Sequence, residues 1–241
     1  MSFDIKDIDI DIDLVFRLKS STIPSPAEQC RELWAISRAL GRNGLDVAKW
    51  GIGDVSDSGG IENSRAFTDL GPTDEAIYSV IETPDIGEQS FSVWNGIEGP
   101  GGAAFSISCS LKNLSVFELK SEGLEALYSL QSLSDVVKEA VNIWPAAVAQ
   151  VGPYLYSQKK VFRDRPGVGW MLYLPYALTS AQVPEARALI PVTRDGNQQG
   201  TIIVSVADEV FDVSNRAHVK VANDIEIRLA DQDLLPRFVD L

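Results

Sequence analysis

Apolar and charged residues alternate strictly along the first part of this chain. The apolar positions are Ile8, Ile10, Ile12, Leu14, Phe16 and Leu18, and the charged ones are Asp7, Asp9, Asp11, Asp13, Arg17 and Lys19. A period of two predicts a half-buried β-strand with one face in the core. The aspartates on the other face repel one another, so that face must be wet or must meet something positive.

These aspartates do not match a calcium loop. Such a loop needs a glycine at its sixth position and a glutamate at its twelfth, and counting from Asp7 these positions hold Ile12 and Leu18. The alternation is better explained by a charged sheet face, of the kind that guards a strand edge against aggregation.

The rest of the chain predicts strands and helices in mixed order. A capping box at Ser25 with Pro26 starts a helix that stops near Gly41. Further helices are expected over 74–82, over 122–144 with Ser134 capping its second part, and over 216–231 behind Ser214 or Asn215. Strands are expected over 45–52, 91–97, 103–111 and 115–119, in a pair 154–162 and 168–174 around Pro166-Gly167, and in a pair 187–193 and 200–206 around Asp195-Gly196.

This order favours an α+β fold. We expect a single domain over residues 1–241, with a largely antiparallel sheet, packed helices and a long C-terminal helix. A flexible acidic loop is predicted over about 53–75, where Gly, Ser and Asp dominate.

The charge balance narrows the function classes. Lys plus Arg number 21 and Asp plus Glu number 34, so the formal net charge is −13. A chain this acidic is not expected to bind nucleic acid directly, because such proteins neutralise phosphates with Lys and Arg. No apolar run approaches the ~20 residues that span a bilayer, and the acidic start is unlike a secretory signal, so we expect a cytoplasmic protein with no membrane partner.

Most of the charge lies in one window, residues 46–98, which holds eleven acids against Lys49 and Arg65, a net of −9. It is either a solubilising surface or an anionic docking surface for a basic partner, in which aromatic side chains would supply affinity. The candidate partner-binding residues are Asp54, Asp57, Glu62, Asp74 and Glu75, with Trp50, Phe67, Tyr78 and Trp94 as aromatic anchors.

The signals for catalysis are weak. Asp57-Ser58-Gly59-Gly60 is similar to the serine motif of trypsin-like proteases, but those carry their histidine before the serine, and here the one histidine, His218, follows it. A flexible turn explains the motif, and His218 is better read as a packed helix residue. Cys30 and Cys109 lie on apolar faces and are expected in the core. We therefore expect no enzyme activity, no metal and no cofactor.

Basic and glycine-rich clusters near turns have ordinary explanations. Lys159, Lys160, Arg163 and Arg165 are expected on a solvated hairpin or as internal partners for the acidic excess. Gly167–Gly169 and Glu98–Gly102 lack the strand-to-helix context of a phosphate cradle and are predicted to be turns.

Three stretches carry a family resemblance. They are Phe16-Arg17-Leu18 through Leu33-Trp34, the block RPGVGWMLYLP over 165–175, and the block HVKVANDIEIRLADQDLLP over 218–236. On these the chain resembles the immunity protein 52 family of bacterial polymorphic toxin systems, and in particular its type VI secretion members. The resemblance implies a protein encoded beside a toxin, which it binds to prevent self-killing.

The resemblance also implies the kind of partner. The usual toxin is a DNase with a restriction-endonuclease fold, whose cleft is basic, so an acidic inhibitor can occupy the surface that DNA would use. The family has no catalytic residues to transfer, and its strong positions at Gly169-Trp170 and from Asn223 to Leu229 are expected to be structural. The alternatives are an effector-specific chaperone or adaptor, and a hydrolase using Ser58 or a carboxylate pair. Oligomeric state stays open.

Overall fold

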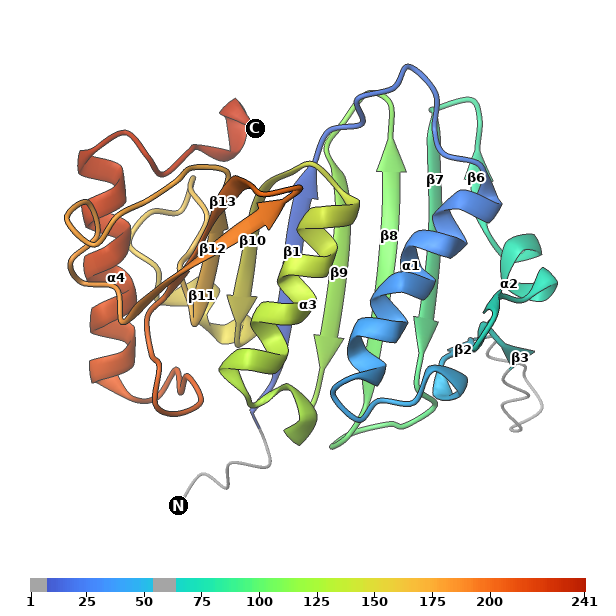
Figure 1. Ribbon diagram of the computed structural model, residues 1–241, viewed down its shortest axis with the longest axis horizontal. Coiled ribbons are helices and arrows are strands. Elements are labelled where there is room, and N and C mark those ends of the chain that lie inside the picture. The colour runs from blue at the N-terminus through green and yellow to red at the C-terminus, as the bar shows by residue number, and fades with distance from the viewer. Residues whose placement is uncertain (1–7, 54–63) are drawn as a thin grey trace.

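Thirteen strands and four α-helices make up the described residues, 8–53 and 64–241, of the computed structural model (Figure 1). The strands are β1 (Ile10–Phe16), β2 (Gly51–Ile52), β3 (Ser64–Arg65), β4 (Phe67–Thr68), β5 (Gly71–Pro72), β6 (Ile81–Thr83), β7 (Glu88–Trp94), β8 (Ala103–Ser110), β9 (Ser115–Ser121), β10 (Ala146–Gly152), β11 (Met171–Leu174), β12 (Ala188–Arg194) and β13 (Asn197–Val204). The α-helices are α1 (Pro26–Gly41), α2 (Asp74–Tyr78), α3 (Leu130–Ile143) and α4 (Arg216–Asp231), and short 3₁₀ turns are η2 (Val47–Lys49), η3 (Glu125–Leu127), η4 (Tyr154–Gln158) and η5 (Phe238–Asp240).

The alternating segment forms β1, in the middle of the main sheet. The strand order is β12-β13-β11-β10-β1-β9-β8-β7-β2-β3, with β6 paired to β7 and with antiparallel pairing between the named strands. As predicted, the apolar side chains of β1 from Ile10 to Phe16 are buried. The expectation that its acidic face guards a sheet edge is wrong, because β1 has a hydrogen-bonded neighbour on each side.

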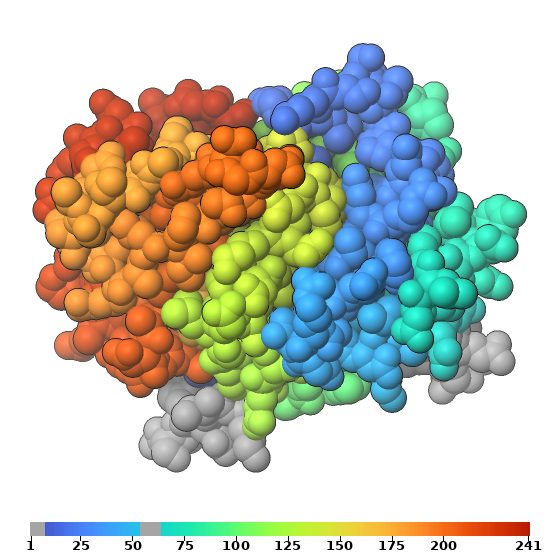
Figure 2. Space-filling model, in the orientation of Figure 1, coloured from blue at the N-terminus to red at the C-terminus, as the bar shows by residue number. Residues whose placement is uncertain are grey.

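Two helices cover one face of this sheet. α1 and α3 lie side by side across it (Figure 1), and in the space-filling view they form a continuous layer (Figure 2). The capping box at Ser25 and Glu28 starts α1 as predicted. α3 is capped by Ser129 and not by Ser134, which is buried inside the helix.

The far end of the sheet carries the long C-terminal helix. α4 lies beside β11 and β13 (Figure 1), and β11 is buried along its whole length. Its start is capped by Asn215. The predicted hairpin 187–193 and 200–206 is confirmed as β12 and β13, and Asp195 and Gly196 at its turn both have positive φ, 51° and 77°.

Several predicted elements are corrected. The strand pair 154–162 and 168–174 is wrong: β10 ends at Gly152, η4 follows, and the strand β11 covers only 171–174. The segment 45–52 is mainly the turn η2, and the helix predicted over 74–82 ends at Tyr78. Residues 64–75 are built into short strands and the start of α2, whereas residues 54–63 of the predicted acidic loop lie outside the described residues.

A buried carboxylate explains why the segment after β10 is not a strand. Glu226 of α4 is completely buried, and it accepts hydrogen bonds from the backbone N–H groups of Val161 at 2.7 Å and Val168 at 3.0 Å. The hydroxyl of Tyr156 donates to the same carboxylate at 2.6 Å. Because a side chain satisfies this backbone, it needs no strand partner.

Candidate functional site

Within residues 8–53 and 64–241, no helix covers the second face of the sheet at β1, β9, β8 and β7. Cross-strand register places their outward side chains in three rows, and we call these twelve residues the open face: Asp11, Lys120, Ala104 and Trp94; Asp13, Glu118, Ser106 and Ser92; Val15, Val116, Ser108 and Ser90. Each of them is partly or fully exposed, whereas the residues that alternate with them within these strands are buried. A surface of this kind, flat and without a covering helix, is available for contact.

Charges on the open face are poorly matched. Asp13 lies directly opposite Glu118 on β9, and like charges at such a position destabilise a sheet. Lys120 lies opposite Asp11, but its Nζ is 3.6 Å from Glu118 Oε1. Within the described residues, neither the Asp11 nor the Asp13 carboxylate makes a hydrogen bond or an ion pair, so both remain available to a ligand cation.

Burial and this crowding of negative charges raise the pKa values of the carboxylates. Burial, together with the neighbouring charge of Asp13, raises the pKa of Asp11 to about 7. Burial and the charge of Glu118 raise the pKa of Asp13 in the same direction. Half-buried acids with raised pKa values are frequent at functional sites, although structural clusters also produce them.

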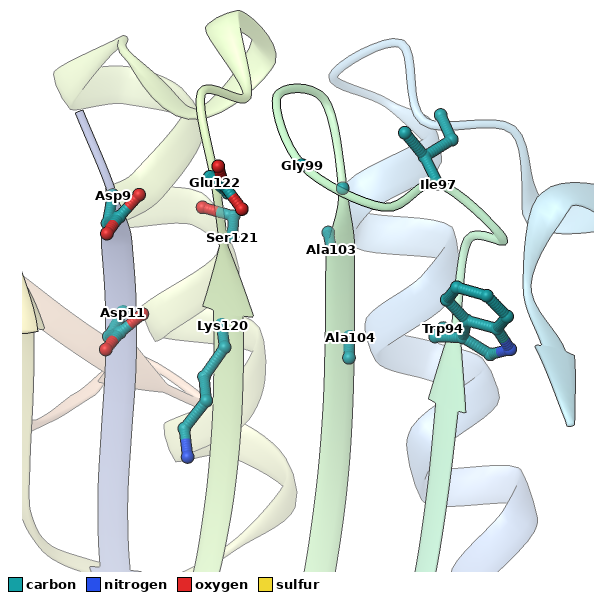
Figure 3. Close-up of a pocket in the computed structure, with 11 residues that line it drawn as sticks. Asp9, Asp11, Trp94, Ile97, Gly99, Ala103, Ala104, Lys120, Ser121 and Glu122 are labelled. Atoms are coloured by element: carbon teal, nitrogen blue, oxygen red, sulfur yellow. The ribbon is translucent and has the colours of Figure 1, made fainter. Parts of the chain in front are cut away.

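Three hollows indent the open face. One of about 320 Å³ runs from Asp11 and Lys120 to Trp94 and is closed at its rim by Ile97 (Figure 3). The view in Figure 3 is onto the open face, with the helices behind the strands, and Lys120 extends from β9 toward β1.

A second hollow, of about 180 Å³, lies where β1 meets β10. It is lined by Asp11, Asp13 and Gln150 on the sheet, and by Tyr154 and Lys160 on the following segment. The third, of about 340 Å³, lies over the serines of β7 and β8 and reaches Ile81 of β6.

The aromatic candidates from the sequence fall into different environments. Trp50 and Phe67 are core residues in this structure: both are essentially unexposed and pack edge-on or stacked against Phe105. They are therefore not exposed anchors, because the apolar layer under α1 covers their rings. Tyr78 of α2 is 86% exposed, and Trp94 belongs to the open face.

The acidic candidates are also separated. Asp74 and Glu75 are exposed in the first turn of α2, which packs against α1 and β3 rather than on the open face. Asp54, Asp57 and Glu62 lie outside the described residues. The structure therefore brings Asp74, Glu75 and Tyr78 together on α2, and leaves Trp94 on the open face.

Residues considered for chemistry have structural roles where they are described. His218 is buried; its Nδ1 accepts from the backbone N–H of Asp212 at 3.0 Å, and its Nε2 is 2.9 Å from Glu209. Both cysteines are buried, as predicted. In residues 8–53 and 64–241, no group of three or more His, Cys, Asp or Glu side chains is arranged to hold a metal ion; Ser58 lies outside these ranges.

Sequence reasoning identified the acidic half of the open face and missed its serine half. Ser90 and Ser92 flank Phe91, and Ser106 and Ser108 flank Ile107, so both strands alternate polar and apolar residues just as β1 does. That signal could have placed the three strands on one uncovered face. None of the helices in the described part of the chain combines the length and apolar character needed to cross a bilayer.

Comparisons with known proteins agree with this fold. The family model described as "Immunity protein 52" matches residues 81–237, about two thirds of the chain, and includes two of the three stretches that carry the resemblance. A search of curated proteins found no match. Among solved structures, one described as "Pseudomonas aeruginosa T6SS protein PA0821" is similar, with a TM-score of 0.54 and 12% sequence identity over 90% of this chain and 76% of that one.

Proposed function

Because the chain belongs to the immunity protein 52 family, we propose that it neutralises a cognate toxin effector by binding it one-to-one. The family match carries this proposal. The geometry supports it, since the structure offers a broad uncovered sheet face and no assembled catalytic or metal centre in its described residues. A protein that acts by binding needs only such a surface.

The acidity of the chain supports a basic, nuclease-type toxin. A net charge of −13 is opposite in sign to a toxin surface that attracts DNA phosphates, so the two proteins would attract each other. The family resemblance suggests a restriction-endonuclease fold for that toxin. The fold that the chain shares with a type VI secretion protein supports a role in type VI secretion. A toxin that cleaves DNA would have to be neutralised in the cytoplasm, which supports a cytoplasmic location.

The exposed acids of α2 are proposed to steer the encounter. Asp74 and Glu75 project from α2 beside the exposed ring of Tyr78, and Asp54, Asp57 and Glu62 belong to the same acidic window. Charges at the rim of an interface mainly raise the association rate. Asp74→Lys with Glu75→Lys should therefore slow association at low salt and change dissociation little. An equal double reversal at Asp231, the last residue of α4, and Asp233, just after it, is the control, and unchanged association in the α2 variant would exclude this surface.

Inhibition is tested with the toxin encoded beside this chain's gene. Its DNA cleavage should stop at about one equivalent of the purified protein, and the two chains should co-elute from a sizing column. Ser58→Ala should protect as well as the wild type, since binding does not require a nucleophile. Undiminished cleavage without a complex would refute the proposal.

A chaperone or adaptor role is the second candidate, and the uncovered face would serve it equally well. It predicts that cells carrying the toxin gene survive deletion of this protein, whereas an immunity protein predicts that they die.

A further inference from the structure

We propose that the open face is the toxin-docking surface, and that the hollow between β1 and β10 receives a basic side chain of the toxin between Asp11 and Asp13. This inference rests on the proposed function and says where on the molecule the toxin binds. It differs from the acidic window predicted from sequence, because β1 lies outside that window.

The shape of the open face suits a protein partner. The four strands of the open face, from β1 to β7, span about 19 Å, and seven residues of β1 extend for about 23 Å, so the floor is roughly 440 Å². A stable interface buries about 800 Å² on each partner. The rims can supply the difference, since Tyr154 is 68% exposed beside β10 and Ile81 is 66% exposed on β6.

The floor allows close approach of a partner. Apart from Trp94, the outward residues along β7 and β8 are Ser90, Ser92, Ala104, Ser106 and Ser108. These side chains are short, so little conformational entropy is lost when they are covered. Their hydroxyls can donate or accept hydrogen bonds once water is displaced.

The net negative charge of the open face indicates which kind of partner binds there. The open face carries Asp11, Asp13 and Glu118 against Lys120 alone, so a second copy of the same face would be repelled. A basic surface would instead relieve the unfavourable Asp13–Glu118 pair. A nuclease cleft, which attracts phosphates, has this chemistry.

The hollow between β1 and β10 has the groups to hold a guanidinium. Asp11 and Asp13 offer two carboxylates on one strand face, spaced two residues apart, and Gln150 lies opposite Asp13 on β10. The exposed ring of Tyr154 lines the same hollow and can stack on a cation. Lys160 is the cation that faces this hollow from the side of η4; its Nζ donates to the carbonyl oxygen of Arg165 at 2.8 Å and so is held away from the carboxylates.

Two sets of variants test the assignment. Asp11→Asn with Asp13→Asn removes two charges from the hollow at constant shape, and Asp231→Asn with Asp233→Asn removes two exposed charges at the C-terminal end of α4. Binding to the toxin encoded beside this chain's gene is measured by calorimetry and by association and dissociation rates. We expect the first pair to weaken the affinity by about tenfold or more, mainly through faster dissociation, as for charge pairs desolvated in an interface. The control pair should change it by less than about threefold.

A third variant tests the floor directly. Ser92→Arg places a long cation on an exposed position of the open face and should abolish the complex while the chain stays folded, as circular dichroism would show. Full affinity in both Ser92→Arg and the Asp11/Asp13 variant would overturn the inference and leave immunity through another surface standing. A wild-type dimer that Ser92→Arg dissociates would also overturn it, in favour of self-association. If the wild type does not bind the toxin at all, the proposed function itself fails.

Discussion

Replacing Asp11 by Asn should remove a defined part of the pH dependence of stability. Burial, and next the charge of Asp13, raises the pKa of Asp11 from 3.8 to about 7; Asp9 and Glu118 add to this increase and Lys120 opposes it. In the unfolded chain the carboxyl ionises near its ordinary pKa. Between the two values the folded protein therefore binds more protons than the unfolded one, and stability falls as the pH rises.

The magnitude follows from these two pKa values. Their difference corresponds to about 4 kcal/mol when the carboxyl is fully ionised in both states. Because the unfolded state is largely ionised by about pH 5, roughly 2.5 kcal/mol of this is lost between about pH 5 and about pH 8. Since Asp11 keeps some contact with water, we expect a measured loss of about 1–2.5 kcal/mol.

The assay is urea denaturation at these two pH values, followed by tryptophan fluorescence. Asp11→Asn should be more stable than the wild type at the higher pH and should show a smaller decrease between the two. Glu32, whose pKa is also raised by burial, contributes equally to both proteins. Asp13, whose pKa is raised by burial as well, loses a repelling neighbour in Asp11→Asn, and this adds to the smaller decrease. Asp208→Asn, on an exposed loop, is the control. A decrease of the same size in the wild type and Asp11→Asn would refute the account of the open face as a strained acidic cluster.

Three further predictions concern the core. Glu226→Ala should lower the free energy of unfolding by about 3 kcal/mol or more in urea titration, because the buried N–H of Val168 and the part-buried N–H of Val161 lose their acceptor; a loss below about 1 kcal/mol would contradict this. Gly200→Ala should cost about 1–3 kcal/mol by the same measurement, since an added Cβ would collide with the Leu174 carbonyl and the Tyr173 ring; an unchanged midpoint would show that β11 can move aside. Burial raises the pKa of Cys30 to about 12 and of Cys109 to about 11, so a disulfide reagent at about pH 8 should label neither thiol until the protein is denatured; rapid labelling of the native protein would contradict this.

The elements that sequence predicted well are those whose signals are local. The alternation from Ile10 to Phe16 identifies β1 and its buried side, and the Ser25–Glu28 capping box marks the start of α1. The turn at Asp195-Gly196 predicts the β12–β13 hairpin, because both residues adopt positive φ there. In each case the physical cause lies within a few residues of its effect.

The elements that sequence missed depend on distant residues. Residues 154–162 and 168–174 read as a pair of strands, but Glu226, far along the chain, accepts the backbone hydrogen bonds of Val161 and Val168 instead. The rings of Trp50 and Phe67 look like surface anchors because they lie within an acidic window, yet both pack in the core against Phe105 of β8. Likewise, a local pattern could show that β1 has an acidic face but could not show that β9 would place Glu118 opposite Asp13.

The central position of β1 has a consequence for biosynthesis. Its neighbours in the sheet, β9 and β10, lie at residues 115–121 and 146–152, so all the residues between Phe16 and Ser115 must be synthesised before β1 finds its first hydrogen-bonding partner. Contacts this far apart in sequence form slowly, and unpaired strands are prone to aggregate in the meantime. A chain that ended before β10 would therefore leave β1 with an open edge on that side.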